Sequence, residues 1–236
     1  MRGIILISMF AAGFAQAGWN DYEEVRKLEL DQSGVSRLVV RAGAGSMDVR
    51  GVDGLDKIAV RAQIGVLKAD EDKALKVIEK RMVLELKRDG DEARLDSWFE
   101  DGSFGLGHDA YIALEIEIPE GLAIDIDDGS GSIDVIDTRG DVTIDDGSGS
   151  IDVENVASLK IDDGSGSIDV DGAAGDVSII DGSGSISVVD VEGSVTIDDG
   201  SGSIRVTDVT NDVTIIDGGS GSVTIRDVQG EVEQET

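Results

Sequence analysis

The stretch IDDGSGSIDV, from Ile144 to Val153, recurs in near copies through the second half of the chain. The hydrophobic residue that follows Gly-Ser-Gly-Ser returns after 18, 17, 18, 18 and 19 residues. A fixed period of this length is the signature of a repeat architecture in which each repeat forms one rung of a solenoid. The six aligned positions are Ile133, Ile151, Ile168, Ile186, Ile204 and Val223.

Each repeat contains two short runs in which apolar, mostly β-branched residues alternate with polar ones. In one repeat Ile133 and Val135 flank Asp134, and the second run is DVTID at 141–145. Alternation with a period of two predicts β-strands with one buried face. Because one repeat has too few apolar residues to fold alone, we expect the repeats to stack and to align these residues in columns.

The two irregular steps of the repeat indicate that the strands keep a fixed register. The 17-residue step loses its residue within 154–158, and the 19-residue step gains one at Gly218-Gly219. We expect both changes to fall between strands, since a one-residue slip inside a strand would turn its apolar side chains outward.

The first half of the chain has a different pattern, which predicts a cap on the solenoid. LVVRAGAGSMDV, at 38–49, matches the repeat and predicts a diverged rung. An uncovered solenoid end would recruit other strands, so we expect the rest of residues 18–124 to cover the N-terminal end. The elements expected there are strands at 56–66 and 111–118, a helix at 69–81 with acids first and bases last, and a hairpin over 82–95.

Together these patterns predict a mainly β fold. It is a single-stranded parallel β-solenoid of about six 18-residue rungs over residues 125–236, with an N-terminal α+β capping region over 18–124.

Residues 1–17 predict a secretory signal peptide. Arg2 precedes an apolar run at 3–14, and Ala15-Gln16-Ala17 is typical of a cleavage site between Ala17 and Gly18. We therefore expect an exported protein in the periplasm, at the cell surface or outside the cell, with no transmembrane segment after signal removal. The chain has no cysteine, so neither a disulfide nor a lipid-anchoring cysteine is expected.

A formal net charge of −30 bears on the choice of partner. Such a surface repels nucleic acid and anionic lipid and attracts cations. We expect no nucleic-acid partner and favour an envelope protein or polysaccharide. End-to-end self-association of the rod is an alternative, against which the charged C-terminal EVEQET would act.

One acidic position is occupied by Asp in every repeat, directly before the glycine-serine segment. Stacked charges about 4.8 Å apart repel by roughly 1 kcal/mol in bulk water, so something should offset the repulsion. We expect each carboxylate to accept backbone N–H groups just beyond it in an Asx-type turn, with no cofactor. The alternative is a cation-binding acidic solenoid that takes calcium. The metal candidates are Asp128, Asp146, Asp163, Asp181, Asp199 and Asp217.

The segment SWFEDGSFGLGHDAY, at 97–111, gathers most of the aromatic residues that follow the signal and the single histidine. We expect a glycine-rich loop whose aromatics pack the cap; the alternative is a loop that binds a ligand or partner. Ser103, His108 and Asp109 are catalytic residue types, but nothing in the sequence orders them in space, so no catalytic residue and no enzyme activity is predicted. The candidate loop residues are Trp98, Phe99, Phe104, His108 and Tyr111.

A second alternative is a glycan-binding or glycan-active protein. Outward hydroxyls recur at Thr143, Ser178, Thr196 and Thr214, as on some glycan-binding solenoids, although Lys160 interrupts them. A glycan-active enzyme would lose activity on His108→Ala.

The export signal, the turn IPEGLAIDID at 118–127 and the repeated GSGSIDV resemble one known family. It is the putative-adhesin family of β-strand-repeat domains of unknown function, with a toast-rack-like β-solenoid. The resemblance covers about Leu38 to Val232. It implies a non-enzymatic adhesin or a binding and scaffold module of the bacterial cell envelope, and it brings no catalytic residues.

Overall fold

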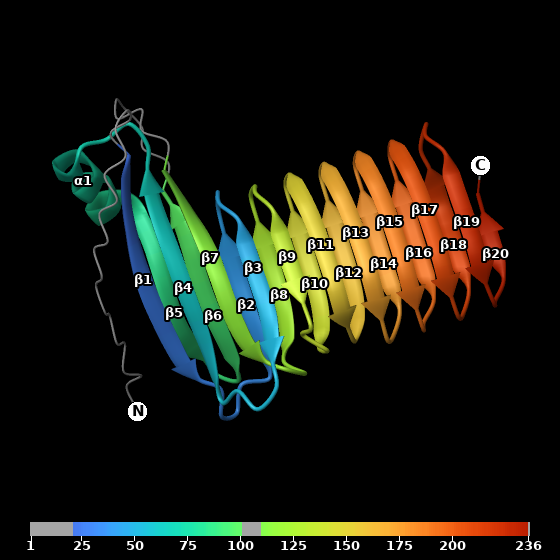
Figure 1. Cartoon of the computed structure of the whole chain (residues 1–236), viewed down its shortest axis with the longest axis horizontal. Helices are drawn as coiled ribbons and strands as arrows, with labels where there is room; N and C mark the ends of the chain where they lie inside the picture. The colour runs from blue at the N-terminus through green and yellow to red at the C-terminus, as the bar shows by residue number, and fades with distance from the viewer. Residues whose placement is uncertain (1–20, 101–109, 236) are drawn as a thin grey trace.

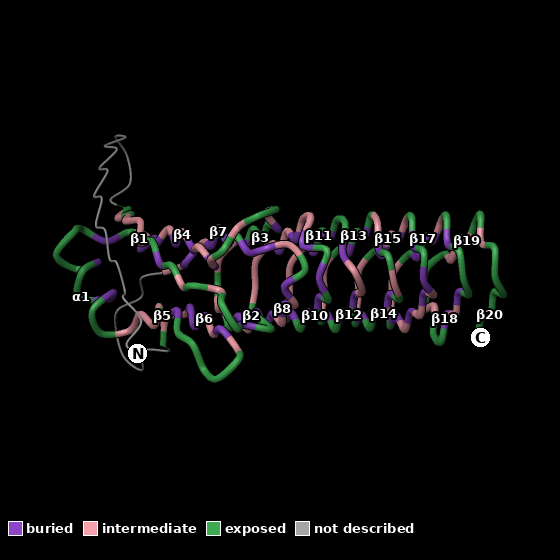
Figure 2. The backbone as a smooth tube through the Cα atoms, turned by 90° about the horizontal axis from the view of Figure 1, so that it is seen from below, coloured by how far each residue is buried: buried purple, intermediate pink, exposed green. Residues whose placement is uncertain are grey.

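A computed structural model of the chain describes residues 21–100 and 110–235. The chain forms a long rod of two sheets that face each other, with one helix at the N-terminal end (Figures 1 and 2). The predicted mainly β solenoid with rungs about 18 residues apart is therefore confirmed. The predicted signal peptide at 1–17 and its cleavage site at Ala17 and Gly18 lie outside the described residues.

Each sheet has ten strands, and the sequence alternates between the two sheets along the rod. Sheet A contains, in spatial order, β1 (Tyr22–Asp31), β4 (Lys57–Val66), β7 (Ala110–Pro119), β3 (Met47–Val52), β9 (Ile133–Ile136), β11 (Gly149–Val156), β13 (Gly166–Ala173), β15 (Gly184–Val191), β17 (Gly202–Val209) and β19 (Val223–Val228). Sheet B contains β20 (Val232–Gln234), β18 (Val213–Gly218), β16 (Val195–Asp199), β14 (Val177–Asp181), β12 (Ser158–Asp163), β10 (Asp141–Asp146), β8 (Ala123–Asp128), β2 (Arg37–Ala42), β6 (Glu92–Phe99) and β5 (Met82–Asp89).

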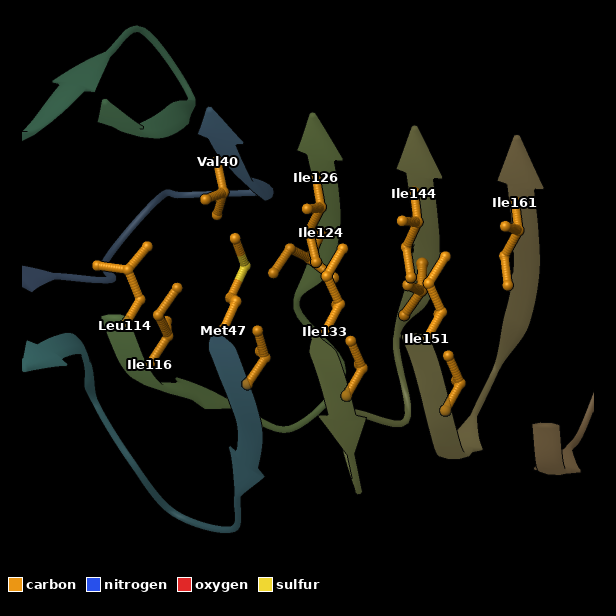
Figure 3. Close-up of a cluster of buried hydrophobic side chains, with 14 of the residues drawn as sticks. Val40, Met47, Leu114, Ile116, Ile124, Ile126, Ile133, Ile144, Ile151 and Ile161 are labelled. Carbon is orange, nitrogen blue, oxygen red and sulfur yellow. The ribbon is translucent and has the colours of Figure 1, made fainter. Parts of the chain in front are cut away.

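From β8 onward the rungs repeat one arrangement. Neighbouring strands pair in parallel with equivalent residues side by side, so that Ile144 lies between Ile126 and Ile161. The inward apolar residues of both sheets form one continuous core. The backbone of the buried residues is purple in Figure 2. Figure 3 shows these columns where the regular rungs begin, with Val40, Met47, Leu114, Ile116, Ile124, Ile126, Ile133, Ile144, Ile151 and Ile161 labelled.

The two irregular steps have different outcomes. The shorter step falls at Ala157, between β11 and β12, and both strands keep their register, as predicted. The expectation for the longer step is wrong, because the pairing of β16 with β18 shifts between Ile197 and Asp198, placing Asp217 opposite Asp198. The extra residue is Ile216, and it forms a β-bulge. A bulge here follows the last buried residues of β18, so it absorbs one residue without turning them outward.

In the N-terminal region, the order of the strands in space differs from their order in the sequence. The diverged rung β2–β3 packs directly against the first regular rung, with Met47 beside Ile133 although 86 residues separate them. On its other side, β6 and β7 pair with β2 and β3. The strands that follow β3 in the sequence, β4 to β7, therefore extend both sheets away from the rod. Strand β1 forms the end of sheet A and β5 the end of sheet B, an arrangement that the sequence did not indicate.

The helix lies beyond these end strands (Figure 1). The helix predicted at 69–81 is α1 (Glu71–Arg81). Asp70 caps it, because its Oδ1 accepts the N–H of Lys73 at 3.0 Å. Acids in the first turn and bases in the last complement the helix dipole. Its inward residues Ala74, Val77 and Ile78 join the core.

Candidate functional site

The glycine-serine segment is the tight corner between a strand of sheet B and the next strand of sheet A. At Gly166 the backbone has φ +152°, and an added Cβ would lie 1.4 Å from the carbonyl oxygen of Gly149 on the preceding rung. Gly149, Gly184 and Gly202 show the same close approach to the rung before. The second glycine of each corner is thus fixed by rung stacking, which gives the segment a structural role.

The aspartate before each corner points into the rod. We call the column formed by Asp128, Asp146, Asp163, Asp181 and Asp199 the aspartate ladder. In-register pairing places these residues side by side along sheet B, and their exposed fractions are only 0–5%. The sixth candidate, Asp217, is exposed because the bulge at Ile216 turns it out of the column.

The expected Asx-type turn is present in the later rungs. An Oδ1 atom accepts the N–H of the serine two residues on, at 3.1 Å for Asp163, 3.0 Å for Asp181 and 2.9 Å for Asp199. Asp217 makes the equivalent bond to Gly219 at 2.8 Å. The Oδ2 atoms of Asp163, Asp181 and Asp199 are buried without a hydrogen-bond partner, as are both carboxylate oxygens of Asp128 and Asp146.

Burial raises the pKa of every carboxyl in the aspartate ladder. It raises the pKa of Asp128 to about 7, with a further contribution from the charge of Asp146. The pKa of Asp181 rises to about 6, mainly through burial, while the N–H of Ser183 opposes the rise. The amides after Asp128 oppose the rise in its pKa too, but they do not reach hydrogen-bond geometry. The pKa values of Asp146, Asp163 and Asp199 are also raised, with burial as the largest cause.

A second set of carboxylates lies on the outer face of sheet A. They line an open hollow of about 440 Å³ that crosses β9, β11, β13 and β15, and we call it the sheet A groove. None of its carboxylates forms an ion pair among the described residues, although Ser187 and aliphatic side chains share its walls. The groove carboxylates are Asp134, Asp152, Glu154, Asp169 and Asp171.

The groove carboxylates influence one another across rungs. Partial burial, followed by the charges of Asp48 and Asp152, raises the pKa of Asp134. Partial burial and the charge of Asp169 raise the pKa of Asp152. Asp48 continues this column toward the N-terminus, and Glu115 lies beyond it. The sequence did not predict that these carboxylates form one groove. One sign of it was Asp48 in GAGSMDV at 43–49, because Asp48 occupies the same repeat position as Asp134.

The predicted aromatic loop is divided between strands and residues that are not described. Trp98 and Phe99 end β6, and Tyr111 lies at the start of β7, so these three are strand residues. Tyr111 lies over Gly65, where an added Cβ would be 2.2 Å from the ring, and its hydroxyl donates to Glu23 at 3.3 Å. Phe104 and His108 lie outside the described residues, as do Ser103 and Asp109.

Residues 21–100 and 110–235 contain no group of three or more His, Cys, Asp or Glu side chains arranged to hold a metal ion. Within the same ranges, no helix has the length and apolar character needed to cross a membrane. On the outer face of sheet B, Lys160 lies between Thr143 and Ser178 and interrupts the hydroxyl column, as predicted.

No family model and no curated protein matches this chain. A solved structure described as a putative adhesin, from Parabacteroides distasonis, is 10% identical, with a TM-score of 0.43 over 89% of this chain and 97% of that one. A putative cell adhesion protein from Clostridium sporogenes is 12% identical, with a TM-score of 0.33 over 91% of this chain and 100% of that one. A putative lipid binding protein from Parabacteroides distasonis is 11% identical, with a TM-score of 0.37 over 91% of this chain and 97% of that one.

Two of these descriptions name adhesion, as does the family that the repeat residues resemble. None of the three names an enzyme. With identities of 10–12% and TM-scores below 0.5, the three structures are only distantly similar to this chain.

Proposed function

We propose that this chain is an exported, non-enzymatic binding or scaffold module of the bacterial cell envelope, and that it binds through the sheet A groove. The observation that carries the proposal is the groove itself, in which five carboxylates on stacked strands share an open hollow and have no ion-pair partner within the described part of the chain. Unpaired charges on a rigid face attract and orient a partner of opposite charge. The signal-like residues 1–17 support export.

The chemistry of the groove favours a basic protein segment as the partner. Its two acidic columns, one from Asp134 to Asp169 and one from Glu154 to Asp171, repeat at the rung spacing of about 4.8 Å. Lysine and arginine side chains on an extended segment can pair with several such carboxylates at once. Ile136 and Val189, which also line the groove, can contact the aliphatic parts of those side chains.

The groove can be tested with a matched pair of double variants. Asp152→Asn with Asp169→Asn removes two charges from the groove, whereas Asp145→Asn with Asp162→Asn removes two from the outer face of sheet B. The probe is a lysine- and arginine-rich peptide, titrated by calorimetry at low and at 0.3 M salt. We expect the groove variant to bind at least about tenfold more weakly, and the sheet B variant to bind like wild type.

Equal weakening in both variants would show that the peptide responds only to net charge, and the groove would lose its role. Tight binding of a neutral envelope polysaccharide in place of the peptide would also contradict the proposal and favour the glycan alternative. Export is checked separately, by fractionating cells that express the full chain and sequencing the N-terminus of the product, which we expect to begin at Gly18.

A further inference from the structure

The aspartate ladder contains more unsatisfied carboxylate oxygens than a structural turn requires. Five stacked aspartates are 0–5% exposed, and each has at least one oxygen atom without a hydrogen-bond partner. Buried polar atoms of native proteins nearly always have a partner, so a column of orphans calls for an explanation. The apolar core and the glycine-serine corners surround the ladder.

The choice of residue indicates that the negative charge itself is used. An Asx-type turn needs only a side-chain oxygen, which the uncharged amide of asparagine supplies equally well. Yet all six repeats have aspartate at this position. The next column outward is looser, since Asp162 and Asp198 alternate with Ile180. A neutral turn would not favour acid so uniformly at the buried position.

The spacing of the ladder fits one class of cation. Asp146, Asp163 and Asp181 pair in register, which sets successive residues about 4.8 Å apart. A repeated bond to the serine amide holds Asp163, Asp181 and Asp199 in one orientation, so their Oδ2 atoms follow the same spacing. A point midway is about 2.4 Å from each oxygen, within the range of about 2.3–2.6 Å for calcium and outside the range of about 2.0–2.1 Å for magnesium.

We propose that calcium ions bind between successive carboxylates of the aspartate ladder, inside the rod. This site is separate from the sheet A groove and does not depend on the function proposed for it. The charge of five carboxylates balances about two divalent ions. We therefore expect calcium in every second space between successive carboxylates of the ladder. Each gap offers two carboxylates, which is why the ladder contains no three-residue metal cluster within the described chain. Backbone oxygens or water complete the coordination.

Calcium and protons compete for the same oxygens. Without calcium, buried carboxyls take up protons to avoid an uncompensated charge. The charged groups nearest to the ladder are also acids, namely its outward neighbours Asp127, Asp145, Asp162 and Asp198, with Asp217 beyond its end. No lysine or arginine forms an ion pair with a ladder residue among the described residues, so cations from solution are the available counter-charge.

The test compares Asp163→Asn with Asp162→Asn in the full chain. The two residues are adjacent and lose the same charge, but Asp163 lies in the middle of the ladder and Asp162 is exposed. After chelation, each protein is melted in calcium chloride or magnesium chloride at equal ionic strength. We expect calcium to raise the Tm of wild type and of Asp162→Asn by several degrees more than magnesium does. In Asp163→Asn, the difference between calcium and magnesium should be much smaller.

A second measurement holds even if Asp163→Asn fails to fold. Calcium and, separately, magnesium are titrated into wild type by calorimetry. We expect about two calcium ions per chain and weaker binding of magnesium. Equal Tm shifts with calcium and magnesium in wild type, equal losses in the two variants, or no saturable calcium binding in the titration would each overturn the proposal and leave only screening of the acidic surface.

Discussion

The N-terminal part of the molecule, β1 to β7, and the regular rod from β8 onward build the same two sheets by different means. The N-terminal part uses antiparallel pairs, a helix and ion pairs such as Arg61–Glu115 and Lys57–Glu29, with nitrogen–oxygen distances of 2.6 and 2.7 Å. The rod uses parallel pairing and one repeated corner, and its carboxylates are mostly unpaired among the described residues.

This difference shows how stability is distributed. In the N-terminal part the surface contacts differ from strand to strand, and each exposed ion pair contributes little on its own. In the rod each rung contacts only its neighbours, so a change that blocks stacking separates the two rungs on either side of it. The rod can therefore carry unpaired acids on its surface and inside its corners, because its apolar core and backbone pairing stabilise it.

The largest effect is expected from Gly166→Ala. The new Cβ would overlap the carbonyl oxygen of Gly149, and the close approach of the two backbones leaves no room for it to move. We expect a loss of more than about 4 kcal/mol in the free energy of unfolding, or failure to fold. Gly90→Ala is the control in the N-terminal part, because it has φ +67° and open space around its Cβ. It should lose about 1 kcal/mol from backbone strain. Urea unfolding followed by circular dichroism measures both, and similar losses would refute the stacked corner.

Core truncation should give the next largest effect, in both regions. Ile186→Ala in the rod and Ile64→Ala in the N-terminal part remove fully buried side chains, and each should lose about 2–5 kcal/mol. Ile180→Ala, which is 44% exposed on the outer face of the rod, should change stability by less than about 0.5 kcal/mol. A loss at Ile180 as large as that at Ile186 would mean that the strands of the rod are out of register.

The pH dependence of stability should have opposite signs in the two regions. Asp128 has a pKa raised to about 7, so its folded form holds a proton that the unfolded form releases near pH 4. Stability is therefore highest below the unfolded pKa and is lost as pH rises through about 7. In the N-terminal part, hydrogen bonds from Ser33 and Lys73 lower the pKa values of Asp31 and Asp70, whose contribution is lost as pH falls below 4.

In calcium-free buffer we expect the Tm of wild type to fall by several degrees between pH 5 and pH 8. Asp128→Asn should flatten this profile and raise the Tm at pH 8, because it removes a buried charge. The exposed neighbour provides the control, since Asp127→Asn relieves surface repulsion only. If both variants flatten the profile equally, the dependence comes from net charge and not from the ladder.

The smallest effect is expected from the surface ion pairs of the N-terminal part. Arg61→Met breaks the pair with Glu115, in which both side chains are more than a third exposed. We expect a loss below about 1 kcal/mol that shrinks in 0.5 M salt. A loss of several kcal/mol would show that the N-terminal part depends on single contacts after all.

The sequence predicted the rod well because each rung repeats the same local signals. Period-two alternation predicted that Ile133 and Val135 share one buried face, and both are fully buried. The interleaving of β2–β3 between β6–β7 and β8–β9 could not be predicted, since it depends on contacts between distant segments that no local pattern encodes. The bulge at Ile216 was missed because a repeat alignment places an extra residue in the glycine turn by default.

The aspartate column was visible in the sequence, and so was the alternation that sets its orientation. The alternation that buries Val142 and Ile144 extends two residues further to Asp146, and following it would have placed the carboxylate inside the rod. The charge of aspartate argued for a surface position, and packing of the corner overrode that preference. The sheet A groove combines residues from several rungs with an open shape, and shape follows only from the assembled structure.

The repeat turns its aspartates into the interior of the rod. Carbon-13 NMR of the aspartate carboxyls, titrated from pH 3 to 9 in calcium-free buffer, tests this placement most directly. We expect Asp128 to titrate near pH 7 and Asp181 near pH 6, with the other ladder carboxyls above the usual aspartate value near 4. If all five titrate near pH 4, the carboxylates lie in water and the account is contradicted.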